Sequence, residues 1–187
     1  MIETKEDLVY YLHEDKLALG KKRKPKLIGD YIYKFQIELR YCEFYKKKSK
    51  FNPFKIYHYI KYKTLSVKLG FSIPLCVFGP GLSIAHYGTI VVNPSAKIGN
   101  NCRLHECVTI GATNGDSRSA KIGDNVFIGS GARIIGNVSI ASDVAIAANA
   151  VVVKNIDEPG TTWGGIPAKK ISNNNSHNNI NPQLFEH

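Results

Sequence analysis

A six-residue period runs through the second half of the chain and restricts its fold more than any other feature. Counting in sixes from Ile98 to Val152 meets Ile, Leu or Val at nine of ten positions, and Asp116 is the exception. Small or β-branched apolar residues, such as Val126 and Ala132, recur four positions after most of these. Neither the helical period of about 3.6 residues nor the two-residue period of a single strand gives this pattern. It predicts short strands joined by tight bends, three hexads to a triangular coil, stacked into a parallel solenoid. An irregular β-sandwich is the alternative.

The period is interrupted twice. The step from Ile90 to Ile98 is eight residues long, so the sequence places a two-residue shift at VVNPSAK (91–97), just after His86. The missing step at Asp116 lies in the polar stretch GATNGDSRSAK (111–121), which predicts a loop that leaves the coil. Because breaks in a regular scaffold are where functional groups are usually placed, we expect the site near these segments.

The motifs around these interruptions are specific. HYGTIVV (86–92), VTIGAT (108–113) and PGTTWGGIPAKKI (159–171) follow one another along the hexads. Their order and spacing resemble the hexapeptide-repeat acyltransferases, with the closest likeness to serine acetyltransferase and its relatives in capsule and exopolysaccharide synthesis. The resemblance covers about residues 69–171. It implies a mainly β fold, a left-handed parallel β-helix over residues 71–171, a homotrimer, and acetyl-CoA as co-substrate in the cleft between neighbouring prisms.

Residues 1–70 have a different character. They hold 17 Lys and Arg against 8 Asp and Glu, which accounts for +9 of the chain's net charge of +10. Residues 4–18 and about 27–70 read as helices, with a new helix beginning after Asn52 at Pro53. Tyr31, Phe35, Leu39 and Cys42 fall near one helical face. We expect a small basic α-helical N-terminal region.

Two interpretations of that basicity remain open. The lysines either solvate a helical cap on the solenoid or contact anionic lipid or a lipid-linked glycan. Nucleic acid is not an expected partner, because no recognition module accompanies the charge. The N-terminus lacks the apolar run of a signal peptide, and the four cysteines show no paired metal spacing. Both features indicate a cytoplasmic protein, with contact at the inner face of the membrane as a further expectation. The Asn-rich residues 172–187 are expected to form a flexible tail.

The chemistry expected of such a coil falls first on His86. Acetyl transfer to a hydroxyl needs a base for the hydroxyl proton, and a neutral imidazole suits that task. His86 lies beside the shift in the period and matches the active-site His of the resembled family, which identifies it as the candidate catalytic base.

Other roles follow from the resemblance alone. The backbone of residues 111–113 corresponds to the segment that faces the thioester. Trp163 either stacks on adenine or seals the last coil. The residues expected to bind acetyl-CoA, including Lys169 for its phosphates, are Gly111, Ala112, Thr113, Gly129, Ser130, Ala148 and Lys169.

The acceptor is inferred from departures from the serine enzymes. Phe71 and Ala85 stand where the resembled enzymes carry acids, and Arg118-Ser119-Ala120 replaces the stretch that holds their second active-site His. These changes remove the groups that would recognise free serine, so the sequence favours a sugar hydroxyl in surface polysaccharide synthesis. The residues expected to line that pocket are Tyr87, Asn93, Glu106 and Arg118. Glu106 is alternatively expected to orient His86 from the neighbouring coil.

Three rival functions stay open. Serine O-acetyltransferase of cysteine biosynthesis is the first. A zinc solenoid of the γ-type carbonic anhydrase kind is the second, although the coil offers only His86 and His105 where that site needs three histidines, so no metal is expected. A purely structural or binding solenoid is the third.

Overall fold

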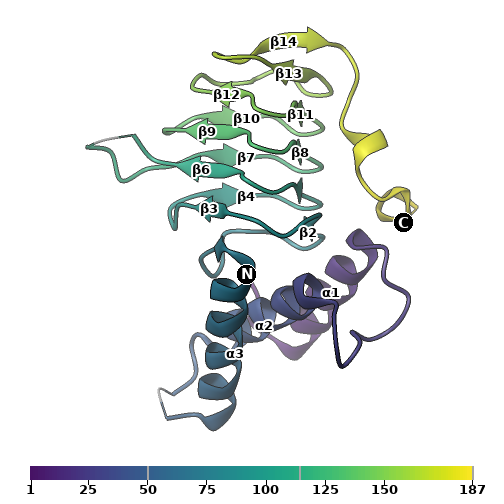
Figure 1. Cartoon of the computed structure of the whole chain (residues 1–187), viewed down its shortest axis with the longest axis vertical. Coiled ribbons are helices and arrows are strands. Elements are labelled where there is room, and N and C mark those ends of the chain that lie inside the picture. The colour runs from purple at the N-terminus through teal and green to yellow at the C-terminus, as the bar shows by residue number, and fades with distance from the viewer. Residues whose placement is uncertain (50, 114, 187) are drawn as a thin grey trace.

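The computed structural model describes residues 1–49, 51–113 and 115–186, with three helices at one end and a stack of coils at the other (Figure 1). The helices are α1 (Lys5–Ala18), α2 (Tyr31–Tyr45) and α3 (Pro53–Leu69). The expected helix start is confirmed, since the Asn52 side chain accepts the N–H groups of Phe54 and Lys55, and Pro53 occupies the first turn. No described helix is long and apolar enough to cross a bilayer.

Fourteen short strands follow the helices among the described residues. Their bounds are β1 (Phe71–Ser72), β2 (Ser83–Ile84), β3 (Ile90–Val92), β4 (Lys97–Ile98), β5 (Arg103–Leu104), β6 (Thr109–Gly111), β7 (Lys121–Ile122), β8 (Phe127–Ile128), β9 (Arg133–Ile135), β10 (Ser139–Ile140), β11 (Ala145–Ile146), β12 (Val151–Val152), β13 (Thr162–Gly164) and β14 (Lys169–Ser172). Every pairing is parallel except that of β13 with β14.

The strands form three sheets whose order confirms the predicted coils. One sheet runs β1-β3-β6-β9-β12, the second β10-β7-β4, and the third β14-β13-β11-β8-β5-β2. Each coil thus gives one strand to each sheet. Arg133 pairs with Val151 and Phe127 with Ala145, and both offsets are the length of three hexads. The left-handed sense of the coil stays a prediction.

The expectation of a mainly β chain needs correction. The helices hold 14, 15 and 17 residues, whereas the strands hold two to four. Most residues of a coil lie in its bends, because each hexad keeps only a short extended stretch. The molecule is therefore a helical region joined to a parallel coil.

An apolar column fills the coil. Leu104, Ile128 and Ile146 are fully buried in successive coils, and Ile110 and Ile134 are fully buried on the neighbouring side. These are the inward positions that the six-residue period predicts. The coils also approach closely at their bends, since a Cβ atom on Gly129 would lie 2.7 Å from the backbone nitrogen of Ala148.

A buried polar cluster attaches the helices to the first coil. Arg40 of α2 is fully buried and donates to Asp15, Glu43 and the carbonyl oxygens of Phe78 and Gly79. The Gln36 side chain donates to the carbonyl of Leu82 and accepts the N–H of Ile84. These bonds fix the segment that leads directly into the bend carrying His86.

The Asn-rich C-terminal segment differs from the flexible tail that the sequence predicts. Its described part runs back along the coil toward α1 (Figure 1). His177 lies 2.7 Å from an Asp143 carboxylate oxygen, and the Asn181 amide donates to the carbonyl of Leu17. Ile180 and Leu184 are buried against the end of α1. Two apolar residues among the asparagines are enough to hold the segment in place.

Candidate active site

The bend that carries His86 is two residues longer than its counterpart in the next coil. Ile84 pairs with Leu104 and Val92 pairs with Ile110, so eight residue steps on one coil match six on the next. The sequence placed this shift after His86, at residues 91–97, and that placement is wrong. Ile90 and Val92 are both buried, so the period alone did not show which of them continues the column. The extra residues lie in the bend of His86 itself.

Gly88 lets this long bend pack against the next coil, which carries Glu106. Its φ is 135°, and its N–H donates to the carbonyl of Leu69 at the end of α3. A Cβ atom on Gly88 would lie 3.0 Å from the Cβ of Glu106. Glycine thus allows the bend to approach Glu106 closely.

Four of the predicted site residues occupy the same position in successive coils. Ile84, Leu104, Ile128 and Ile146 are in register across the sheet. The residues two positions after them are His86, Glu106, Ser130 and Ala148. The structure therefore brings these four predictions together along one edge of the coil.

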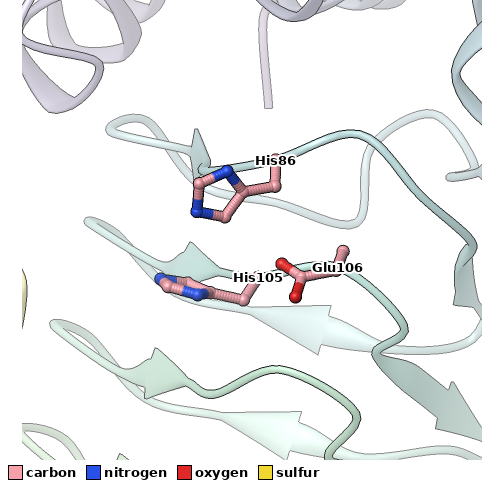
Figure 2. A group of neighbouring side chains, drawn as sticks. All are labelled: His86, His105 and Glu106. Atoms are coloured by element: carbon pink, nitrogen blue, oxygen red, sulfur yellow. The ribbon is translucent and has the colours of Figure 1, made fainter.

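Three side chains converge at the start of this edge (Figure 2). One ring nitrogen of His86, one ring nitrogen of His105 and one carboxylate oxygen of Glu106 lie within 4.8 Å of one another. The two imidazole rings meet edge to face, with centroids 5.4 Å apart. His86 is exposed, whereas His105 and Glu106 are partly buried. An accessible base thus lies beside a carboxylate from the neighbouring coil.

Glu106 is held in place and charged. Its Oε1 accepts the Ser130 hydroxyl at 2.6 Å, and this hydrogen bond lowers the pKa of Glu106. Its Oε2 is buried and has no hydrogen-bond partner within the part of the chain that the structure describes. An unpartnered buried carboxylate oxygen is costly, so this atom favours a donor such as a protonated His86. The alternative that Glu106 orients His86 now has a geometric basis.

His105 completes the cluster as a neutral group. Burial is the main cause that lowers its pKa, and the nearby Arg103 lowers it further. The sequence did not assign a role to His105. Two imidazoles and one carboxylate are also a donor set that suits Zn²⁺. Glu106 would supply a third ligand in place of the third histidine that the sequence lacks.

The remaining predicted residues divide between two further places. Gly111 ends β6, and Ala112 and Thr113 begin the long loop after it. Asn93 lies in the bend after β3, so all four residues are at a different corner of the coil from His86. The loop leaves the coil as predicted (Figure 1). Its Arg118 is paired with Asp116 at 3.0 Å. Only Tyr87 and Glu106 of the predicted acceptor residues lie beside His86.

The predicted phosphate-binding lysine lies at the far end of the coil. Lys169, Lys154 and Trp163 line a groove of about 420 Å³ there. The Trp163 ring packs against the apolar column, and its Nε1 donates to the Thr161 hydroxyl at 2.9 Å. These contacts favour the sealing role for Trp163 over adenine stacking.

A pocket between the helices and the coil was missed by sequence reasoning. It measures about 250 Å³ and is lined by Lys21, Asp30, Ala85, Tyr87 and Arg103, among others. Lys21 and Asp30 form an ion pair at 2.7 Å. Among the described residues, Arg103 has no acidic partner, and its Nη1 lies 3.4 Å from the Ser83 hydroxyl. No sequence signal marks Arg103, because the pocket exists only once the helical region packs against the coil.

The comparisons with known proteins agree with the coil. Residues 119–154 match the bacterial transferase hexapeptide (six repeats) family. This match covers the regular part of the coil, from the end of the long loop to β12. A serine acetyltransferase of Staphylococcus epidermidis is 34% identical over 122 residues, which cover 60% of this chain and 57% of that protein. The chain thus spans little more than half the length of that curated relative.

Solved structures extend the likeness to the helical region. The serine acetyltransferase of Neisseria gonorrhoeae matches with a TM-score of 0.66 and 26% identity, covering 97% of this chain and 69% of that one. The same enzyme in complex with serine matches with a TM-score of 0.63 and 26% identity, covering 90% of this chain and 70% of that one.

These findings correct the expected acceptor. The sequence favoured a sugar hydroxyl and a place in surface polysaccharide synthesis, whereas the relatives and the structural neighbours are named serine acetyltransferases. The prediction of a sugar acetyltransferase is therefore wrong, and nothing in the comparisons supports a closer likeness to capsule enzymes.

Proposed function

We propose that the protein is an acetyl-CoA-dependent serine O-acetyltransferase that acts in the cytoplasm. The observation that carries this proposal is the match of nearly the whole chain to the fold of a serine acetyltransferase, with an exposed His in the lengthened bend between β2 and β3. The named relatives move acetyl to serine, and His86 supplies the base that such a transfer requires.

His86 acts directly, without an acyl-enzyme. Its free imidazole nitrogen takes the proton of the serine hydroxyl as the oxygen attacks the thioester carbonyl carbon. The carbon–sulfur bond then breaks, and the same imidazole returns the proton to the coenzyme A thiolate. A backbone N–H of residues 111–113 stabilises the oxyanion formed between these steps.

A second copy of the chain completes the site. His86 and residues 111–113 lie at different corners of one coil. In the homotrimer expected for this family, the His86 edge of one prism meets the loop corner of the next, and acetyl-CoA occupies the cleft between them. Ser130 and Ala148 then line its pantetheine arm, with Lys169 at the coil end near its phosphates.

Glu106 is a positioning residue for His86. Its carboxylate lies in the cluster with the imidazole, and the Ser130 hydroxyl keeps the carboxyl ionised. An ionised carboxylate stabilises the imidazolium that forms during proton transfer. Glu106 thereby performs the task that an acid at Phe71 or Ala85 would otherwise perform.

The acceptor pocket suits a zwitterion. Serine carries a carboxylate and an ammonium group, and both are costly to desolvate without partners. Arg103, which has no acidic partner among the described residues, offers a guanidinium to the carboxylate, and Asp30, which is paired with Lys21, would bind the ammonium by exchanging that partner. The replacement of two acidic residues of the resembled enzymes by Phe71 and Ala85 therefore does not exclude serine as the acceptor.

The acceptor is tested by product analysis. The purified protein is incubated with acetyl-CoA and L-serine, and O-acetylserine is measured by mass spectrometry beside release of the coenzyme A thiol. We expect a serine-dependent rate that Arg103→Gln lowers through the KM for serine, with the KM for acetyl-CoA unchanged. Acetylation of a sugar and not of serine would contradict the proposal.

The role of Glu106 is tested by a double-mutant cycle with Glu106→Gln and His86→Ala. Glu106→Gln should lower kcat by about 10-fold or more and leave the KM for acetyl-CoA unchanged. In the His86→Ala background the same change should have no further effect, because its target is absent. Additive losses would show that Glu106 acts elsewhere.

A further inference from the structure

The outward face of α3 is unusually apolar for a surface helix. Tyr62, Ser66 and Leu69 are buried against the rest of the protein. At about 3.6 residues per turn, the opposite face carries Ile56, Ile60 and Val67. The large apolar side chains exposed on this outward face are Ile56 (47%), Tyr57 (54%), Ile60 (58%) and Val67 (85%). We call these four residues the α3 stripe.

Lysines border the α3 stripe on both sides. Lys61 and Lys68 follow one edge and Lys63 the other, and all three are exposed. Lys61 is paired with Glu38. Within the described ranges, Lys63 and Lys68 have no acidic partner and lie over the rings of Tyr59 and Tyr31. The sequence itself has no Asp or Glu between Glu43 and Glu106. Lys63 and Lys68 therefore place positive charge on both borders of the stripe, with no acidic partner among the described residues.

We propose that the α3 stripe docks on the surface of an anionic lipid bilayer. Of the two interpretations of the basic N-terminal region, this selects lipid contact over simple solvation of a helical cap. An interfacial helix needs exposed aliphatic and aromatic side chains to enter the headgroup boundary and lysines to meet anionic headgroups. The α3 stripe has both. Because α3 ends at Leu69, directly before β1, such docking also holds the first coils close to the membrane.

Other occupants fit this face less well. A second copy would bring another chain of net charge +10 against the lysine borders of α3, which costs electrostatic repulsion. A nucleic acid would use the lysines but gain little from Ile56, Ile60 and Val67, since its binding is dominated by phosphate contacts.

The proposal is tested by co-sedimentation with vesicles. We expect the full chain to bind phosphatidylcholine vesicles containing about 30% phosphatidylglycerol at least 10-fold more tightly than vesicles of phosphatidylcholine alone. Lys63→Gln with Lys68→Gln should weaken binding by about five-fold for each lysine replaced. Ile56→Ser with Ile60→Ser should weaken it further while keeping the dependence on charge.

The matched control is Lys97→Gln with Lys154→Gln, which removes the same charge from exposed positions on the coil. It should bind as the wild type does, and circular dichroism should show unchanged folding in all variants. The proposal fails if the control pair weakens binding equally, or if phosphatidylcholine alone binds as tightly. It also fails if the serine substitutions leave vesicle binding intact but change the sedimentation coefficient, which would assign the stripe to contacts between copies. A nucleic-acid surface is the last alternative. The proposal also fails if the lysine variants lose binding to duplex DNA as much as they lose binding to vesicles, while the serine substitutions leave vesicle binding unchanged.

Discussion

Two parts of the same coil differ in regularity. From Lys121 to Val152 every side is one hexad, and strands pair at offsets of 18 residues, as in Lys121 with Ser139. Earlier in the chain the offsets are 20 residues for Ser83 with Arg103 and 24 for Arg103 with Phe127. The regular part buries Ile128, Ile134 and Ile146 completely. The irregular part carries His86, Glu106 and the loop at 111–121. The regular repeats form the core, and the departures from them carry the proposed site.

Making the first bend regular should have the largest effect. Deleting Tyr87 and Gly88 gives the His86 bend the six-step length of its neighbour and moves the imidazole away from Glu106. We expect serine acetylation to fall by about 100-fold or more, because small displacements of a catalytic group are costly. The melting temperature should stay within a few degrees of the wild type. Retained activity would show that the length of the bend is irrelevant.

A cavity in the regular part should lower stability and leave activity nearly unchanged, which is the reverse of the first prediction. Ile128→Ala removes a fully buried side chain, so it should lower the free energy of unfolding by about 2–5 kcal/mol, measured by urea denaturation. Turnover per folded molecule should remain within about two-fold of the wild type. Val153→Ala, at a half-exposed position, is the control and should cost under about 0.5 kcal/mol. A large loss of turnover in folded Ile128→Ala would contradict the claim that the regular part contributes stability without contributing to activity.

The smallest effect concerns pH. Burial lowers the pKa of His105 from its unfolded value, so the unfolded chain binds this proton more readily than the folded one. Stability from this group is present above about pH 6.5 and decreases as the pH falls through the folded pKa. His105→Asn should therefore reduce the loss of melting temperature between neutral and mildly acidic pH. An unchanged pH dependence would mean that His105 does not contribute.

The coil could be predicted from the sequence because each hexad repeats one local pattern of inward and outward residues. The helix start at Pro53 followed from local rules in the same way. The exact site of the two extra residues did not, since Ile90 and Val92 both satisfy the apolar pattern. Arg40 was unpredictable because its partners, Asp15 among them, come from distant segments.

The candidate site was predicted in part. His86 followed from its motif, and Glu106 was raised as one of two alternatives. Its place beside His86 depends on strand register, which sequence spacing alone does not determine once a bend changes length. Arg103 escaped notice because its pocket needs the helical region as a second wall.

The most direct test of the central claim compares His86→Ala with His13→Ala, a control at a half-exposed His on α1. Steady-state serine acetylation and calorimetric binding of acetyl-CoA are measured for both variants. We expect His86→Ala to lose about 10²–10⁴-fold in kcat with acetyl-CoA affinity unchanged, and His13→Ala to match the wild type. Turnover of His86→Ala within a few-fold of the wild type would contradict the account.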